Sequence, residues 1–509
     1  MRRLRRLLAS ALSGVLATLF GMAAGHLVAS LLTPSSSPVL AVAATVIDLT
    51  PTPLKEYAVR EFGTKDKAIL LSTVVLVTLI VSAVAGMLAR RWLRIGAALL
   101  LVLVTTAGVA ALTRPMASAA DVLPSLVAAV VGMTVLVVLT RLLNGEPLRP
   151  SASAEQTQVS RRTLLLVSGC VAGGAAVMGW AGQRIIDYRT RIGNVTLPPP
   201  AKPIPALPAG LENVYPGISD FRTSNSKFYR VDINLSLPVV PVDDWELSVD
   251  GDVDESFSLT FDELSAMPLI ERDITMTCVS NEVGGRYIGA ARWLGVRLTD
   301  LLDRAGVGSG ADQLLSTATD GFTISTPLEA LRDGRDAMVA IGMNGEPLPA
   351  EHGFPARLIT PGLYGFVGAT KWLTKLTLTT YADQTAYWTD RDWATDAPIK
   401  ISSRIDTPRP LENIKPGPTV IGGVAWAQQR GIERVEVRID GGAWTEAILG
   451  PDAGLDYWRQ WYLPWEAPSG SHMLAVRATS VDGEVQTAVR ATPFPEGSSG
   501  IQEIAVSVS

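Results

Sequence analysis

The hydrophobic and polar positions divide the chain into two parts of different character. Apolar runs recur over the first third, at 7–32, 68–89, 95–112, 121–142 and 163–181. Each is close to the roughly 20 residues that a helix needs to cross a bilayer. The first run resembles a secretory signal peptide, but its length and the runs that follow favour a membrane anchor. The pattern predicts an all-α transmembrane bundle of about five helices over residues 1–182.

A further apolar stretch at 38–50 is too short to span and is flanked by prolines. We expect it to be re-entrant or interfacial. After the last run, residues 183–216 form a linker that is rich in proline from 196 onward, which predicts a stiff, extended spacer.

The remainder of the chain is polar and predicts two globular domains. Over 217–405, helical patterns at 260–267 and 300–305 alternate with strand-like runs at 274–279 and 375–380, which is typical of an α+β domain. Over 406–509, strand-like runs at 434–439, 458–462 and 473–479 recur with turn signals such as Asp440-Gly441-Gly442. Short strands at regular spacing predict an all-β, immunoglobulin-like sandwich.

The positive charges predict the orientation of the bundle, because cytoplasmic loops carry an excess of lysine and arginine. The arginines that keep their flanks cytoplasmic are Arg2, Arg3, Arg5, Arg6, Arg90, Arg91, Arg94, Arg141, Arg149, Arg161 and Arg162. Five spans then leave everything after about residue 182 outside, so we expect a multi-pass protein of the cell membrane with an extracytoplasmic C-terminal part. The loop that contains Lys55, Arg60, Lys65 and Lys67 opposes this assignment.

The segment 160–166 (SRRTLLL), which leads into the last span, resembles a twin-arginine export signal. An ordinary arginine pair at a cytoplasmic helix end is the alternative. A twin-arginine route would suit a domain that receives its cofactor before export.

Composition excludes several classes of protein. The net charge is −5 and the globular part has no basic tract, so nucleic-acid binding is not expected. The chain has three histidines, of which only His26 lies in a span, and this excludes a haem held by two histidines of one chain's bundle. The spans contain almost no ionisable residues, which argues against an ion pathway.

The candidate chemistry lies in residues 275–285 (TMTCVSNEVGG), where a strand-like run leads through Cys278 into a glycine-containing loop. A thiolate in such a loop would suit a soft or high-valent metal. A lone cysteine beside an apolar strand is more often a buried, inert residue. The second cysteine, Cys170, lies in an apolar run, so a disulfide between the two is not expected.

This stretch resembles the molybdenum-binding loop of the sulfite oxidase family, which includes the periplasmic methionine sulfoxide reductases. The resemblance continues, in order, at 225–230, 293–296, 298–302, 344–349, 352–358, 364–365 and 368–372. Residues 435–442, 458–461 and 476–478 resemble the family's immunoglobulin-like dimerisation domain. Together these segments cover roughly the last 290 residues.

The resemblance implies a molybdenum–molybdopterin cofactor with a single pterin, bound to the protein through the sulfur of Cys278. The residues that it places around the pterin and its phosphate are Asn225, Tyr229, His352, Arg357, Gly368, Ala369 and Lys371, with Thr317 or Thr319 beside them. Arg230 falls where sulfite oxidases have an arginine that faces the substrate oxyanion, whereas Gly284-Gly285 resembles the reductase form of the loop.

These features predict an oxidoreductase that transfers an oxygen atom on a small sulfur oxyanion such as sulfite. The sequence has no four-cysteine cluster site and no c-type haem motif, so electrons should pass to a separate cytochrome or quinone-linked carrier. A reductase of methionine sulfoxide or another S- or N-oxide is the alternative, and a cofactor-free, membrane-anchored binding protein is the alternative of another class. The dimerisation-like domain suggests a homodimer.

Overall fold

The computed structural model describes residues 2–51, 54, 57–58, 61–62, 65–146, 161–193 and 195–509. The chain separates into two compact units. The first comprises Met1–Arg191 with Ile233–Val239, and the second comprises Ile192–Asp232 with Val240–Ser509. Lys55, Arg60, Arg149 and Ser160, on which the orientation and export arguments draw, lie outside the described residues.

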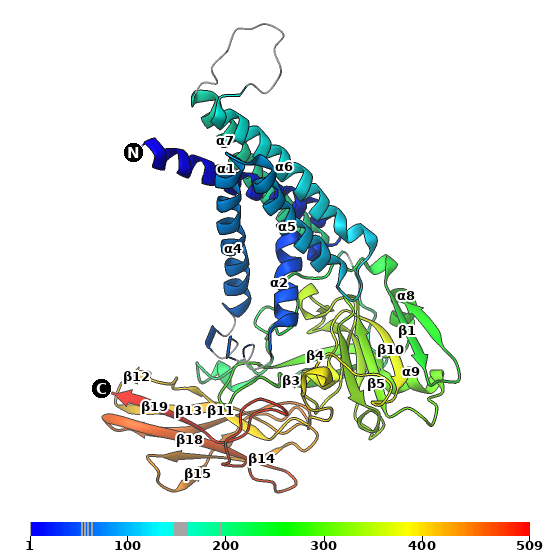
Figure 1. Cartoon of the computed structure of the whole chain (residues 1–509). Helices are drawn as coiled ribbons and strands as arrows, with labels where there is room; N and C mark the ends of the chain where they lie inside the picture. Colours follow the sequence, from blue (N-terminus) through cyan, green and yellow to red (C-terminus); the bar gives the residue numbers. More distant parts are fainter. Residues whose placement is uncertain are drawn as a thin grey trace. The chain divides into compact units, whose positions relative to one another are not determined.

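The first unit is helical (Figure 1). Its helices are α1 (Arg2–Leu31), α2 (Pro38–Leu49), α4 (Asp66–Ala89), α5 (Leu93–Leu112), α6 (Leu123–Asn144) and α7 (Arg161–Arg189), with short 3-10 turns η1 (Pro34–Ser36) and η3 (Ala119–Val122). Among the described residues, five helical stretches are long and apolar enough to cross a membrane, and α2 is a shorter apolar helix. The predicted helical N-terminal region is therefore confirmed.

The last of these helices extends further than the apolar pattern predicts. Residues 183–189 were expected to belong to the linker, yet α7 continues to Arg189. Gln183 donates a hydrogen bond from Nε2 to Oδ1 of Asp187, 2.8 Å away and one turn later. Polar i, i+4 contacts of this kind extend a helix beyond its apolar stretch.

Small residues let the helices of this unit approach closely. A Cβ atom on Gly14 of α1 would lie 1.9 Å from the carbonyl oxygen of Ser82 on α4, and one on Gly21 would lie 2.6 Å from that of Ala128 on α6. Large apolar side chains such as Leu76 and Leu165 instead lie on the outside. Small residues inside and leucines outside are typical of helices that associate in lipid.

The second unit begins with a part that is rich in sheets. One sheet has the order β3-β4-β7-β8 with β9 paired to β7, and another has the order β2-β1-β10-β5-β6. The strands are β1 (Glu246–Gly251), β2 (Phe257–Thr260), β3 (Leu269–Thr277), β4 (Ile288–Arg297), β5 (Gln313–Ala318), β6 (Thr323–Pro327), β7 (Met338–Met343), β8 (Glu346–Pro347), β9 (Arg357–Ile359) and β10 (Leu373–Thr379).

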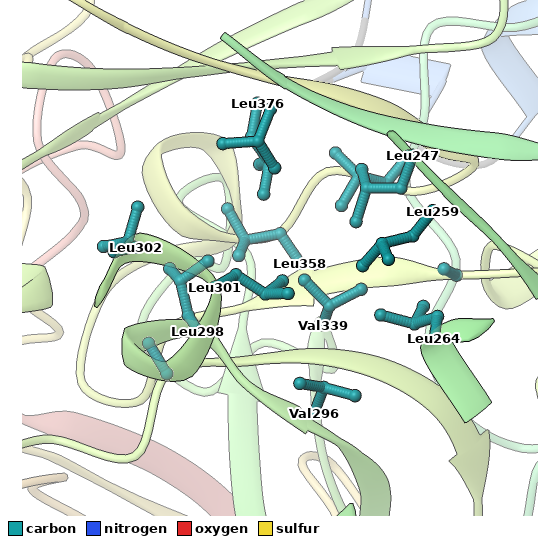
Figure 2. Close-up of a cluster of buried hydrophobic side chains, with 14 of the residues drawn as sticks. Leu247, Leu259, Leu264, Val296, Leu298, Leu301, Leu302, Val339, Leu358 and Leu376 are labelled. Carbon is teal, nitrogen blue, oxygen red and sulfur yellow. The ribbon is translucent and has the colours of Figure 1, made fainter. Parts of the chain in front are cut away.

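Two short helices close the core between these sheets. Thr260 caps α8 (Phe261–Ala266) by accepting a hydrogen bond from the backbone of Glu263, which forms a capping box. The helix α9 (Leu298–Ala305) turns its leucines toward Leu358 of β9 and Leu376 of β10 (Figure 2). This apolar cluster fixes β9, whose first residue is Arg357, against the rest of the domain.

The C-terminal part is all-β and has two sheets, with orders β11-β13-β17-β16 and β12-β19-β18-β14-β15 (Figure 1). Its strands are β11 (Ser402–Thr407), β12 (Asn413–Ile414), β13 (Gly417–Trp426), β14 (Ile432–Ile439), β15 (Trp444–Glu446), β16 (Ile448–Leu449), β17 (Arg459–Ala467), β18 (Gly470–Ser480) and β19 (Gln502–Val508). The sequence correctly predicted a sheet-rich domain followed by an all-β region.

Candidate molybdopterin site

Cys278 is the first residue after β3, where the strand turns away from its partner β4. Its backbone N–H donates to the carbonyl of Tyr287 over 2.9 Å, and its own carbonyl accepts from the N–H of Asn281 over 3.0 Å. The side chain is partly exposed, and its Sγ lies 2.9 Å from Oγ of Ser280. Burial raises the pKa of the Cys278 thiol, whereas the neighbouring Ser280 and the charge of Lys371 oppose that rise.

The strand that carries Cys278 is held by the C-terminal part of the chain. Thr275 donates from its N–H to the carbonyl of Asp456 over 2.8 Å, and its hydroxyl accepts from the N–H of Trp458 over 2.8 Å. Its carbonyl accepts from Nε2 of Gln428 over 3.2 Å. All three polar groups of this buried threonine therefore have partners more than 150 residues later in the chain.

The loop after Cys278 is held by the same part of the chain. The hydroxyl of Ser498 donates to the carbonyl of Asn281 over 2.6 Å, and Arg404 of β11 donates to the carbonyl of Gly285 over 2.8 Å. Gly284 has a φ of +79°, and a Cβ there would lie 2.6 Å from Nε2 of Gln502. The glycine is needed both for the backbone conformation and for this close approach.

Asn225 and His352 are joined although they lie 127 residues apart. Nε2 of His352 lies 2.9 Å from the carbonyl oxygen of Asn225. Burial lowers the pKa of His352 to about 4, so the ring is neutral at pH 7. A carbonyl only accepts, so Nε2 carries the hydrogen and Nδ1 is the acceptor nitrogen. The side chain of Asn225 is fixed by Nδ2 of Asn344, which donates to its Oδ1 over 2.8 Å.

Arg357 is a buried cation with no ion-pair partner in the part of the chain that the structure describes. Its guanidinium donates to the carbonyls of His352, at 3.1 Å, and of Ala369, at 3.4 Å, and lies 5.3 Å from the ring centre of Trp293. Its Nε has no hydrogen-bond partner among those residues. Burial lowers the pKa of Arg357 to about 10, so it stays charged at neutral pH. A buried charge of this kind calls for an anion.

Lys371 and Arg230 share one carboxylate. Nζ of Lys371 and Nε of Arg230 each lie 2.8 Å from Oδ2 of Asp232, which is almost fully buried. The side chain of Lys371 is also buried, and this lowers its pKa to about 8, whereas more than a third of the Arg230 side chain is exposed. Arg230 is thus reachable from solvent, as expected of a residue that meets a substrate.

Two tyrosines flank the cysteine. Tyr229 stacks on Phe228 with ring centres 5.1 Å apart, and burial together with the nearby Cys278 raises its pKa. Burial raises the pKa of Tyr364 to about 12, and Cys278 adds to that rise. Both phenols are therefore protonated at neutral pH and can donate hydrogen bonds.

The remaining predicted residues lie at different distances from this group. Gly368 ends the short helix α10 (Gly365–Gly368), where a Cβ would lie 2.8 Å from the Cβ of Thr360, so the packing requires glycine. Ala369 follows it and provides the carbonyl that Arg357 contacts. Thr317 lies in the ladder of β5, opposite Thr323 and Lys375. Thr319 follows the end of β5, and its N–H donates over 2.9 Å to the carbonyl of Trp372, the residue after Lys371.

These residues fit a molybdopterin. Among the described residues, no group of three or more His, Cys, Asp or Glu side chains could hold a metal ion. A metal at Cys278 would therefore take its other ligands from a cofactor. The unpaired Arg357 suits a phosphate, and the acceptor nitrogen of His352 suits the N–H groups of a pterin.

Three residues of the site were missed from the sequence. Asp232 follows Arg230 by two positions, and Ser280 follows Cys278 by two, so both could have been noticed as close neighbours of predicted residues. Thr275 had no such signal, because its partners come from the C-terminal part.

Comparisons with known proteins indicate the same kind of cofactor. The family profile described as "Oxidoreductase molybdopterin binding domain" matches residues 234–388. Mitochondrial sulfite oxidase of Homo sapiens is 30% identical over 315 residues, which cover 52% of this chain and 56% of that protein. Nitrate reductase [NADH] 1 of Oryza sativa subsp. japonica is 28% identical over 275 residues, covering 43% of this chain and 30% of that protein. The chain spans about half the length of the sulfite oxidase that it matches.

A solved structure has a similar fold over about half of this chain. The sulfane dehydrogenase SoxCD from Paracoccus pantotrophus is 25% identical, covers 56% of this chain and 80% of its own, and superposes with a TM-score of 0.50. The family profile and these relatives indicate the same type of domain. Residues 234–388 are therefore a molybdopterin-binding oxidoreductase domain that is similar to sulfite oxidases, and this similarity implies a molybdenum–molybdopterin cofactor.

Proposed function

We propose that this chain is a membrane-anchored enzyme that transfers an oxygen atom on a small sulfur oxyanion such as sulfite. In this proposal residues 1–182 cross the cell membrane, and residues 217–405 form the catalytic domain outside the cytoplasm. Residues 183–216 link these two parts. Residues 406–509 form an immunoglobulin-like domain through which two copies associate. The five apolar helices and the arginines at their ends support the anchor and its orientation.

The observation that carries the catalytic proposal is the buried, unpaired Arg357 in the same site as Cys278. Trp293 of β4 connects the two. Arg357 lies 5.3 Å from its ring centre, and its Nε1 donates to the carbonyl of Ile274 on β3, the strand that ends just before Cys278. In an apolar interior an uncompensated cation costs several kcal/mol, so the fold keeps one where an anionic ligand compensates it. In the proposal, Cys278 provides a sulfur ligand, and Arg357, His352, Asn225 and Tyr229 hold the pterin and its phosphate.

When bound, the cofactor supplies two-electron oxygen-atom transfer at molybdenum. The chain's own residues position and shield it. The neutral His352 presents Nδ1 as an acceptor, and the hydrogen bond from Nε2 to Asn225 fixes the ring. In the proposal, Gly368, Ala369 and Thr317 or Thr319 complete the surroundings of the cofactor. Arg357 donates to the carbonyl of Ala369, and the N–H of Thr319 donates to the carbonyl of Trp372, the residue after Lys371.

Arg230 is the residue that we propose meets the substrate. Arg230 and Lys371 bring two positive charges, and Asp232 brings one negative charge, so the group keeps one net positive charge. A net positive charge at the entrance favours a small anion over a neutral sulfoxide. Electrons then pass to a separate acceptor, a cytochrome or a quinone-linked partner in the membrane.

A substrate screen tests this proposal. Purified full-length protein should oxidise sulfite with an artificial electron acceptor. Arg230→Met should raise KM for sulfite about tenfold, with kcat little changed, because one charge-assisted contact contributes about 1.5–3 kcal/mol at most. Lys227→Met is the matched control, because Lys227 is an exposed cation of the same segment that pairs with Asp220. Reduction of methionine sulfoxide without sulfite oxidation would establish the alternative reductase function instead.

A further inference from the structure

Ser280 gives the sulfur of Cys278 a hydrogen-bonding partner inside its own loop. Its Oγ lies 2.9 Å from Sγ. The turn closed by the Cys278 carbonyl and the Asn281 N–H brings the serine back over the cysteine. The loop itself thus holds the Ser280 hydroxyl at the sulfur atom.

The direction of the side-chain bond depends on the state of the sulfur. With a free thiol, either Sγ or Oγ can donate. A thiolate that binds a metal has no proton, so the hydroxyl of Ser280 must donate. Metal ligation therefore fixes this bond as O–H to S.

Hydrogen bonds to a ligating sulfur change the electronic properties of the metal. They withdraw electron density from the sulfur, so it donates less strongly and the reduced metal is favoured. We propose that Ser280 is a positioning residue that sets the donor strength of Cys278 and thereby raises the reduction potential of the molybdenum. This inference rests on the proposed ligation by Cys278.

The surroundings single out Ser280 among the nearby hydroxyls. The hydroxyl of Thr277, the residue before the cysteine, is buried and has no partner among the described residues. The hydroxyl of Ser498 reaches the same loop but donates to the carbonyl of Asn281 over 2.6 Å. Ser498 therefore supports the loop, whereas Ser280 contacts the sulfur.

The test compares Ser280→Ala, Ser280→Thr and Ser498→Ala in the full-length holoenzyme. The readouts are molybdenum content, the absorption band from sulfur to oxidised molybdenum, the paramagnetic resonance spectrum of the half-reduced cofactor, and the midpoint potential. We expect Ser280→Ala to retain the metal, shift the band to longer wavelength, alter the resonance spectrum and lower the potential. Ser280→Thr keeps the hydroxyl and should restore the wild-type values.

The Ser498→Ala control distinguishes loss of support for the loop from loss of the hydrogen bond to the Cys278 sulfur. Ser498→Ala should leave the band and the potential at wild-type values, because it removes a bond to a carbonyl only. The inference is overturned if Ser280→Ala binds molybdenum and its band and potential match wild type, or if Ser498→Ala produces the same shifts. Absence of the sulfur band from wild-type protein that contains molybdenum would instead overturn ligation by Cys278.

Discussion

The two units of the chain bury opposite kinds of side chain. In the helical unit, Leu76 and Val77 lie on the outside with more than half of their surface exposed, and serines such as Ser82 lie inside. In the sheet-rich unit the leucines are buried, as in the cluster around Leu358 and Leu376. The first arrangement suits a hydrocarbon solvent and the second suits water.

The units differ equally in their buried charges. Among the described buried residues, Asp121 is the one ionisable side chain of the helical unit, whereas the sheet-rich unit buries His352, Arg357, Arg404 and His472. Buried charges need partners, and Arg404 and His472 have them in Asp406 and Asp440. Arg357 has no such partner among the described residues, and this difference supports the proposal that the cofactor binds in the second unit.

The largest expected effect comes from removing that charge. Arg357→Met should reduce retention of the cofactor by roughly a hundredfold or more, because leaving a buried anion unpaired costs about 3–5 kcal/mol. Pterin fluorescence after release and molybdenum content of the purified protein measure this. Arg438→Met, which removes a cation paired with Glu503 on the C-terminal strands, is the control. Equal cofactor content in both variants would contradict the role of Arg357.

Replacing an exposed valine with aspartate in each unit tests whether lipid or water surrounds that position. Val77 lies at the middle of α4 and is 53% exposed, and Val489 of the C-terminal part is 72% exposed. Val77→Asp should cost about 2.5–3.5 kcal/mol of membrane insertion, whereas Val489→Asp should cost almost nothing. The amount of full-length protein in the washed membrane fraction measures the difference. Equal yields would show that α4 is not surrounded by lipid.

The hydrogen bonds between Thr275 of β3 and the C-terminal part should contribute to the stability of the second unit. Thr275→Val removes the acceptor of the Trp458 N–H and leaves that buried donor unsatisfied, at a cost of about 1–3 kcal/mol. The melting temperature of the holoenzyme should fall. Thr445→Val, at an exposed position of β15, is the control. An equal, small change in both would mean that the C-terminal part does not support the cysteine strand through Thr275.

The smallest expected effect is a pH dependence of stability that comes from the pair of His472 and Asp440. The bond to Asp440 raises the pKa of His472 and lowers that of Asp440. The histidine's contribution is complete below about pH 6.5 and is lost as pH rises through its raised pKa. The carboxylate's contribution is complete above about pH 4 and is lost as pH falls through its lowered pKa.

The pair should therefore stabilise the fold most between about pH 4 and 6.5. Because Asp440 is half exposed, the gain should be less than about 1 kcal/mol. His472→Gln should lower the melting temperature at pH 5.5 and have less effect at pH 8.5. An equal effect at both pH values would show that the charge of His472 does not contribute.

Local patterns made much of the fold predictable. Apolar runs of bilayer length predicted the long helices, and Thr260 with Glu263 marks the start of α8 through its capping box. The apolar run at 163–181 stops several residues before the end of α7, because hydropathy does not detect the polar bond between Gln183 and Asp187. Local hydropathy predicts the ends of helices less accurately than their existence.

The site was less predictable than the fold. Cys278, Arg357 and Lys371 were named because they belong to recognisable segments, whereas the contacts that position them are tertiary. The bonds from Gln428 and Trp458 to Thr275 join segments more than 150 residues apart, and no local pattern encodes them. Thr317 and Thr319 differ by two positions, and the structure shows that Thr319 is the one bonded to Trp372.

The central claim is that Cys278 binds the molybdenum, and the chain provides its own control in Cys170, an exposed residue of α7. Molybdenum content, the absorption band from sulfur to molybdenum, and turnover should be measured on wild type, Cys278→Ser and Cys170→Ser. We predict that wild type and Cys170→Ser contain stoichiometric molybdenum and show both the band and turnover. Cys278→Ser should lose the band and turnover. Retention of both by Cys278→Ser would contradict the account, as would wild-type protein that contains neither molybdenum nor pterin.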